Sequence, residues 1–154
     1  GSLVVVIASL LDQDLAVQVG MGLAVIVGHN WSVYLRLTGG RGIATSIGVI
    51  LGLGLVWEFP VWITLILFGR IARRDTALWT LLGALALPWV AGARGQPAEI
   101  VWMLAAIALL MVTKRTIANW ERPKTGVLRV LTNRILWDRD ESTKENWTVR
   151  RPLP

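Results

Sequence analysis

The sequence contains no cysteine and a single histidine, His29. The lack of cysteine excludes disulfides, thiolate zinc sites and a cysteine nucleophile. One histidine cannot form a histidine-based metal cluster by itself, so we expect no metal site. Charged residues are also scarce, at 17% against about 25% in average soluble domains. Hydrophobic residues make up 54%, and nine residues are tryptophan, which favours membrane–water interfaces. The composition therefore favours a protein of the lipid bilayer.

Six apolar runs are separated by short polar or helix-breaking segments. They are Leu3–Leu11, Leu15–Val27, Ile43–Val56, Pro60–Phe68, Thr76–Ala91 and Ile100–Thr113. Most are shorter than the roughly 20 residues of a full span, but they lack the charged face that a helix in a soluble bundle needs. The sequence therefore predicts an all-α, polytopic membrane protein with about six short transmembrane helices.

The basic residues fall on alternate connections between these runs. Of the 16 lysines and arginines, ten lie at or beyond Lys114. If each run crosses once, the first, third and fifth connections hold Arg94 as their only basic residue. This is the positive-inside pattern, and it places the connection His29–Gly42, the Arg73-Arg74 turn and the C-terminal segment in the cytoplasm. Nucleic acid is not an expected partner, because its binding would need a basic polar surface.

The character of the chain changes after Gly126. Residues Val127–Asp138 predict a helix with one apolar face, made of Leu128, Leu131, Ile135 and Leu136. Arg129 and Arg134 lie off that face. Such an amphipathic helix can lie on the membrane surface or pack against the protein's own loops. We therefore divide the chain into a transmembrane region, residues 1–126, and a cytoplasmic amphipathic and charged tail, residues 127–154.

The segment most suited to chemistry is the loop Gly39-Gly40-Arg41-Gly42. Its glycines permit positive φ and close approach, so successive backbone amides can form an anion-binding nest. The helix expected from Ile43 adds unpaired amides and a positive dipole end. Arg41 can hold a phosphate through two parallel hydrogen bonds, and Thr45 can add a hydroxyl. The residues alone are equally consistent with a tight turn in which Arg41 is a membrane anchor.

His29 stands at the end of an apolar run, just before this loop. A histidine there can titrate near neutrality and act as an acid, a base or a hydrogen-bond donor. It can also be an interfacial histidine with one structural hydrogen bond. No acidic residue follows it within the loop, and nothing in the sequence offers a Ser-His-Asp triad.

The stretch Gly28–Thr45 resembles the second signature of the bacterial acyl-phosphate:glycerol-3-phosphate acyltransferases, the PlsY family. That signature runs approximately Gly-His-x-Phe-Pro-x-Phe-x-x-Phe-Lys-Gly-Gly-Lys-Gly-Val-Ala-Thr. The residues in register are Gly28, His29, Gly39, Gly40, Gly42, Ala44 and Thr45. Thr38 stands in place of the first lysine of the signature, and Arg41 in place of the second.

The segment after the last apolar run resembles the third signature of the same family, His-Arg-x-Asn-Ile-x-Arg-Leu-x-x-Gly-x-Glu. Asn119, Arg122 and Gly126 are in register, whereas Thr116 replaces the histidine. The first signature, a loop of the type Ser-Gly-Asn-Pro-Gly-Ala-Thr-Asn, does not occur. It would precede Gly1, so we expect a chain truncated at its N-terminus.

The resemblance implies a multi-pass enzyme of the bacterial inner membrane, with no cofactor. Its substrates would be acyl-phosphate and glycerol 3-phosphate. The 1-hydroxyl of glycerol 3-phosphate would receive the acyl chain to give lysophosphatidic acid. Membrane lipid would be a further partner. A substrate phosphate would itself accept the hydroxyl proton. The implied catalytic residues are His29, Arg41 and Asn119, and the implied phosphate-binding residues are Gly39, Gly40, Arg41, Gly42, Thr45 and Arg122.

Two other functions stay open at this point. One is a non-catalytic membrane protein, either a degenerate relative or a transporter subunit, that binds a phosphorylated solute. The other is a surface protein that binds anionic lipid through its basic tail. The departures from the signatures keep the first alternative open. Arginine at position 41 keeps the charge but changes its geometry, Thr38 removes a cation, and Thr116 removes an acid–base group.

Overall fold

The computed structural model describes residues 1–72, 75–123 and 126–140, and all the regular structure within these ranges is helical. The seven α-helices are α1 (Ser2–Leu10), α2 (Leu15–Asn30), α3 (Ile43–Gly52), α4 (Glu58–Ala72), α5 (Ala77–Ala93), α6 (Ala98–Ile117) and α7 (Val127–Trp137). Two short 3-10 helices, Val33–Leu35 and Ala118–Trp120, follow α2 and α6. The predicted Arg73-Arg74 turn and the end of the predicted tail, residues 141–154, lie outside the described residues.

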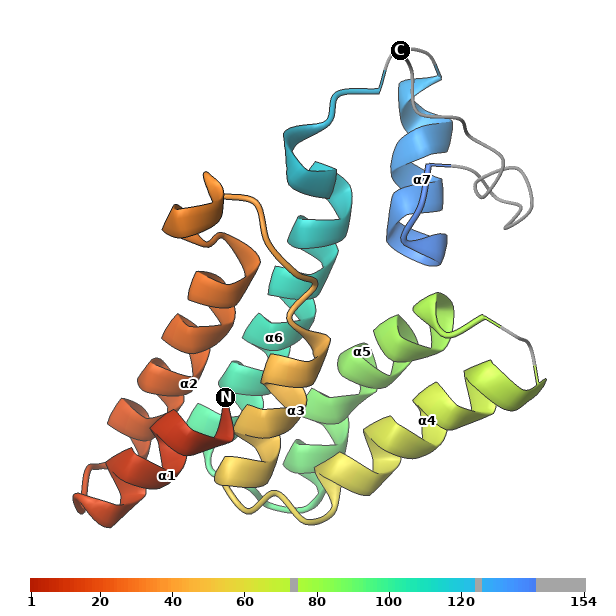
Figure 1. Ribbon diagram of the computed structural model, residues 1–154. Helices are drawn as coiled ribbons and strands as arrows, with labels where there is room; N and C mark the ends of the chain where they lie inside the picture. The colour runs from red at the N-terminus through yellow and green to blue at the C-terminus, as the bar shows by residue number, and fades with distance from the viewer. Residues whose placement is uncertain (73–74, 124–125, 141–154) are drawn as a thin grey trace.

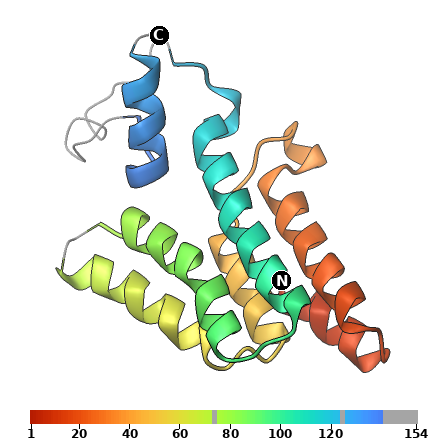
Figure 2. The ribbon, with the colours of Figure 1, turned by 180° about the vertical axis from the view of Figure 1, so that it is seen from behind.

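Each of the six apolar runs forms one helix, which confirms the all-α prediction. The connections that follow α1, α3 and α5 lie at the lower end of the molecule in Figure 1, and those that follow α2 and α6 lie at its upper end. The chain therefore alternates between two ends, as the distribution of basic residues predicted. Helix α6 is central: it packs against α2, α5 and α7, and it remains central when the molecule is seen from behind (Figure 2).

The helices differ in how far they can reach across a bilayer. Among the described residues, only Ala98–Trp120, which is α6 with its 3-10 turn, is both long and apolar enough for a span. Helices α1 and α3 have nine and ten residues. At about 1.5 Å per residue, each reaches about half of a hydrocarbon core of about 30 Å. The idea that every run crosses once is therefore too simple for these two helices.

The short length of α3 sets the depth of the loop before it. From the 3-10 helix at the upper end, the chain returns toward the middle of the molecule, and α3 begins there (Figure 1). Helices α1 and α3 pack against each other in the lower half. A helix N-terminus is thus placed inside the molecule rather than at its edge.

Helix α7 lies against α5 and α6 at the upper end (Figure 1). The prediction of a helix here is confirmed, but the predicted faces are partly wrong. Arg134, assigned to the polar side, is only 3% exposed, whereas Leu128, assigned to the apolar face, is 80% exposed. Ile135 packs against the hydrophobic core. The helix therefore packs against the protein, on helices α5 and α6 rather than on loops, and this turns Arg134 toward hydrogen-bond acceptors. Its position relative to a membrane surface stays a prediction.

Helices α4 and α5 are joined by a buried tryptophan. Trp62 donates its indole N–H to the carbonyl oxygen of Thr80, at 2.9 Å. A Cβ at Gly83 would collide with the indole ring, while a Cβ at Gly92 of the same helix would meet nothing within 4 Å. A glycine at position 83 is what lets the ring reach its acceptor.

We predict that Gly83→Ala destabilises the protein by about 1–3 kcal/mol, the usual cost of overpacking. The matched variant Gly92→Ala should be neutral or stabilising by up to about 1 kcal/mol, because alanine favours helix. Thermal unfolding of both variants in detergent measures the difference. Equal midpoints for the two variants would contradict the proposed contact.

Candidate functional site

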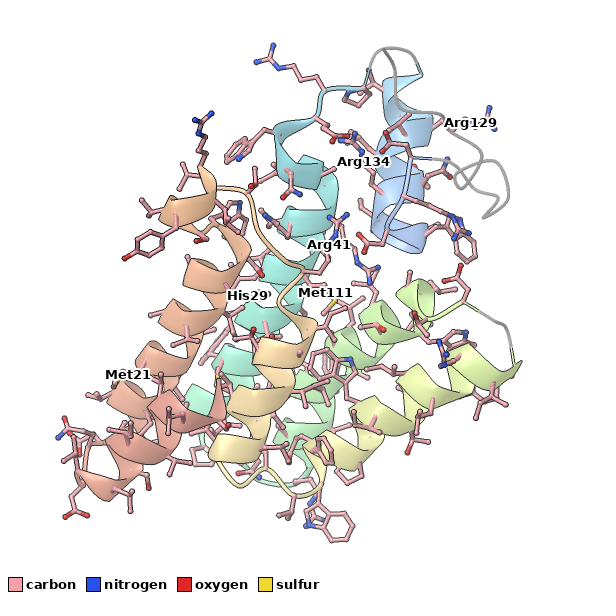
Figure 3. All side chains as sticks on the ribbon, viewed as in Figure 1. Met21, His29, Arg41, Met111, Arg129 and Arg134 are labelled. Carbon is pink, nitrogen blue, oxygen red and sulfur yellow. The ribbon has the colours of Figure 1, made fainter. Side chains whose placement is uncertain are left out.

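The glycine-rich loop lies against the C-terminal end of α2. A Cβ at Gly40 would collide with the imidazole of His29, and one at Gly39 would collide with the backbone carbonyl of His29 and approach that of Asn30. The two glycines are therefore needed for close approach rather than for a positive φ. The structure brings His29 and the loop side by side, as predicted, with Arg41 beside them (Figure 3).

Gly42 is the residue at which the loop becomes a helix. It has φ +72°, and a Cβ on it would lie 2.6 Å from the side-chain oxygen of Asn30. Asn30 is 1% exposed, and neither atom of its amide group has a hydrogen-bond partner among the described residues. Buried polar groups are normally paired. The amide of Asn30 therefore lies beside the N-terminus of α3 without a protein partner among the described residues.

A lysine from α6 completes this region. The ammonium group of the fully buried Lys114 donates to the carbonyl oxygen of Asn30 and lies 5.3 Å from the ring centroid of Trp31. Arg41 Nη1 in turn donates to the carbonyl oxygen of Lys114, at 3.3 Å. Two cations therefore meet at the loop. Sequence analysis missed both Asn30 and Lys114. The available signal was a polar residue beside His29 and a basic residue at the end of a long apolar run.

Arg41 also lines a polar cavity of about 180 Å³. The lining residues are Arg41, Ala118, Asn119, Glu121, Arg134, Asp138, Arg139 and Asp140. Arg41 and Asn119, two of the predicted catalytic residues, thus share one cavity. The indole of Trp120 donates to the carbonyl oxygen of Leu37, at 3.2 Å, which ties this wall to the segment before the loop.

The other predicted residues are not among those that line this cavity. His29 is exposed at the end of α2, and Thr45 is half-buried in the first turn of α3. Arg122 is exposed on the segment after the second 3-10 helix. The structure thus brings Arg41 and Asn119 together and leaves Arg122 outside that group.

An acidic residue of the cavity wall lies close to two arginines, of which only Arg41 also lines the cavity. Asp138, at the C-cap of α7, has Oδ1 at 3.2 Å from Arg41 Nε and at 4.0 Å from Arg115 Nε. Burial raises the pKa of Asp138, and the nearby Arg41 and Arg115 only partly oppose this. The carboxylate is therefore held where its charge is poorly solvated.

The model of the glycerol-3-phosphate acyltransferase family matches residues 1–126. The chain belongs to the glycerol-3-phosphate acyltransferase family. Glycerol-3-phosphate acyltransferase 5 of Dehalococcoides mccartyi is 33% identical over 162 residues, which cover the whole chain and 69% of the relative. A glycerol-3-phosphate acyltransferase of Thermus thermophilus is 33% identical over 121 residues, which cover 75% of this chain and 57% of the relative.

The fold is similar to that of a solved member of the family. The crystal structure of PlsY, an integral membrane glycerol 3-phosphate acyltransferase in its glycerol 3-phosphate form, matches with a TM-score of 0.61 and 24% identity. The match covers 82% of this chain and 66% of that chain. This chain therefore spans about two thirds of the solved protein, and the likeness supports the membrane-protein fold.

Family membership confirms the resemblance that the loop predicted, and with it an acyltransferase of phospholipid biosynthesis acting on glycerol 3-phosphate. The family match contains every predicted site residue but ends before α7. The roles of the individual residues, and the division of the chain at residue 126, stay predictions.

We predict that Gly42→Ala lowers acyltransferase activity at least about tenfold. A positive φ costs a non-glycine residue about 1–2 kcal/mol, and here the new methyl group also presses on Asn30. Gly54→Ala is a matched control, since Gly54 has φ +68° but open space around its Cβ position. Initial rates in membranes, normalised to folded protein, measure the contrast. Equal losses in both variants would show that the contact with Asn30 is unimportant.

Proposed function

We propose that the chain transfers an acyl chain from an acyl-phosphate to the 1-hydroxyl of glycerol 3-phosphate, giving lysophosphatidic acid, at the cytoplasmic face of a bacterial inner membrane. The observation that carries this proposal is the family match together with the cavity that Arg41 shares with Asn119. The positive-inside distribution supports the orientation, with the upper end of Figure 1 in the cytoplasm.

An acyl-phosphate is already activated, so catalysis can rest on positioning and charge stabilisation. The guanidinium of Arg41, the ammonium of Lys114 and the N-terminus of α3 gather positive charge in one place. We assign the substrate phosphate to this place, on Arg41 and the amides of the Gly39–Gly42 loop, with Thr45 as an additional donor. Lys114 supplies from α6 the second cation that the loop lacks at Thr38.

In the proposed reaction, the 1-hydroxyl oxygen attacks the acyl carbon, and the bond between that carbon and the phosphate oxygen breaks. The phosphate leaves with the electron pair of that bond and accepts the hydroxyl proton. His29 orients the hydroxyl or a phosphate oxygen, since its ring lies against Gly40 and is exposed. Asn119 closes the site from the other side of the cavity, and Arg122 attracts the anionic substrates from outside it.

We predict that Arg41→Ala lowers kcat/KM for glycerol 3-phosphate about 100-fold, the usual loss when one donor to a developing charge is removed. Arg41→Lys should recover part of it, because lysine keeps the charge but loses the paired hydrogen bonds. The measurement supplies acyl-phosphate and labelled glycerol 3-phosphate to membranes that contain the full chain and follows lysophosphatidic acid.

The control is Arg70→Ala, which removes the same charge from an exposed position on α4 and should leave the rate unchanged. If lysophosphatidic acid formation survives Arg41→Ala, the assignment of the phosphate site is wrong. Equilibrium binding of glycerol 3-phosphate without turnover would instead favour the binding protein over the enzyme.

A further inference from the structure

Two groups of the protein already contact the guanidinium of Arg41. Its Nε forms an ion pair with Asp138 Oδ1 at 3.2 Å that is not a hydrogen bond, and its Nη1 donates to the carbonyl oxygen of Lys114 at 3.3 Å. Among the described residues, Nη2 has neither a hydrogen bond nor an ion pair. A carboxylate and a phosphate present similar oxygens to a guanidinium, and arginine binds both with two parallel hydrogen bonds. A phosphate that takes the Nε edge of Arg41 must therefore displace Asp138.

Asp138 is held in this place by the anchoring of α7. The guanidinium of Arg134 donates to the carbonyl oxygens of Thr116 and Glu121, at 3.3 and 2.8 Å, and pairs with Asp140 at 2.6 Å. Figure 3 shows Arg134 directed from α7 toward the upper end of α6. These contacts fix the C-terminal half of α7, from which Asp138 reaches the cavity.

A second anchor comes from α6 itself. Arg115 donates from Nη1 to the carbonyl oxygen of Ile135 at 2.7 Å and from Nη2 to that of Ala77 at 2.8 Å. Arg115 thus joins α7 to α5 while its Nε lies 4.0 Å from Asp138 Oδ1. The first residues of α7, Val127 and Leu128, are by contrast exposed. Helix α7 is therefore held at its C-terminal end, which is the end that carries Asp138.

Partial burial makes the charged form of the Asp138 carboxylate less favourable than it is in water. Its side chain is 22% exposed, and burial raises the pKa of the carboxyl group although Arg41 and Arg115 act to lower it. A partly exposed ion pair of this kind contributes little net stability. The contact is thus one that a doubly charged phosphate, which brings more charge and more acceptor oxygens, can replace.

We propose that Asp138 is a resident anion that competes with the substrate phosphate for Arg41, so that α7 sets the phosphate affinity of the site. The proposal rests on the proposed function for the identity of the substrate, but not for the competition itself. It concerns a residue beyond the segment that the family model matches. Asp138 takes no part in the chemical step; it determines affinity by holding Arg41 until the substrate arrives.

The test compares Asp138→Asn with wild type in membranes that contain the full chain. KM for glycerol 3-phosphate should fall about tenfold, since a competing charge-assisted contact is removed, while kcat stays within about twofold. The concentration of inorganic phosphate that halves the rate should fall in parallel. Asp14→Asn removes the same charge from the opposite end of the molecule and should change none of these values. A folded Asp138→Asn protein with an unchanged or higher KM would overturn the proposal.

Two further variants separate competition from general electrostatics and from misfolding. In the Arg41→Ala background, Asp138→Asn should not lower KM for glycerol 3-phosphate, because the guanidinium for which carboxylate and phosphate compete is absent. A fall in KM that persists in this background would overturn the proposal. Asp138→Ser is a second neutral variant, for use if the asparagine does not fold, and should show the same fall in KM. Asp138→Glu keeps the charge and should keep KM at or above the wild-type value.

A binding measurement distinguishes a failure of the proposed competition from a failure of the proposed acyltransferase function. Inorganic phosphate should raise the thermal midpoint of Asp138→Asn at about tenfold lower concentration than that of wild type. If this shift is seen but no lysophosphatidic acid forms, the competition stands and the proposed function fails. If lysophosphatidic acid forms but phosphate acts equally on both proteins, the function stands and the competition is wrong.

Discussion

Glycine at positions 39, 40 and 42 lets the chain turn back against His29 and Asn30, and the depth of the site follows from this contact. A side chain at any of the three positions would collide with the last residues of α2. The loop can therefore enter the molecule only because these positions carry no side chain. Helix α3 then begins near the middle of the fold, beside Arg41 and within reach of α6. An anion held there is surrounded by protein, where each donor is worth more than it is in water.

The upper end of the molecule holds several buried cations that are satisfied mainly by backbone carbonyls. Lys114 binds the last carbonyl of α2, Arg134 binds a carbonyl near the end of α6, and Arg115 binds one near the end of α7. The C-terminal end of a helix carries partial negative charge and unpaired carbonyls, and it therefore accepts cations. Three helix ends are thus joined by basic side chains in addition to apolar packing. This leaves Arg41 as the basic residue that faces a polar cavity from the glycine loop.

Sequence patterns were sufficient for the helices and for the loop. Each apolar run is continuous, and its ends coincide with charged or glycine-containing segments, so local composition decided where α1 to α6 lie. The loop was recognisable because it stands in register with a family signature, whereas its glycines and arginine alone were equally consistent with a tight turn. The approach of Arg41 to Asn119 was implied by the family signatures, and the shared cavity agrees with it. The number of full spans was less predictable, since helices α1 and α3 have only nine and ten residues, too few for a full span.

The burial of polar side chains depended on partners far away in the chain. Lys114 and Asn30 are 84 residues apart, and neither is remarkable in its own segment. Arg134 was predicted only to lie off the apolar face of its helix, and Asp138 only to end that helix, until α7 was placed against α5 and α6. By itself, the sequence determined the helices, the glycine-rich loop and the family, because these depend on local hydrophobicity, glycine content and short motifs. Only the tertiary structure decided which charges are paired and which anion occupies Arg41, because a charge is stabilised by whatever the fold brings within a few ångströms of it.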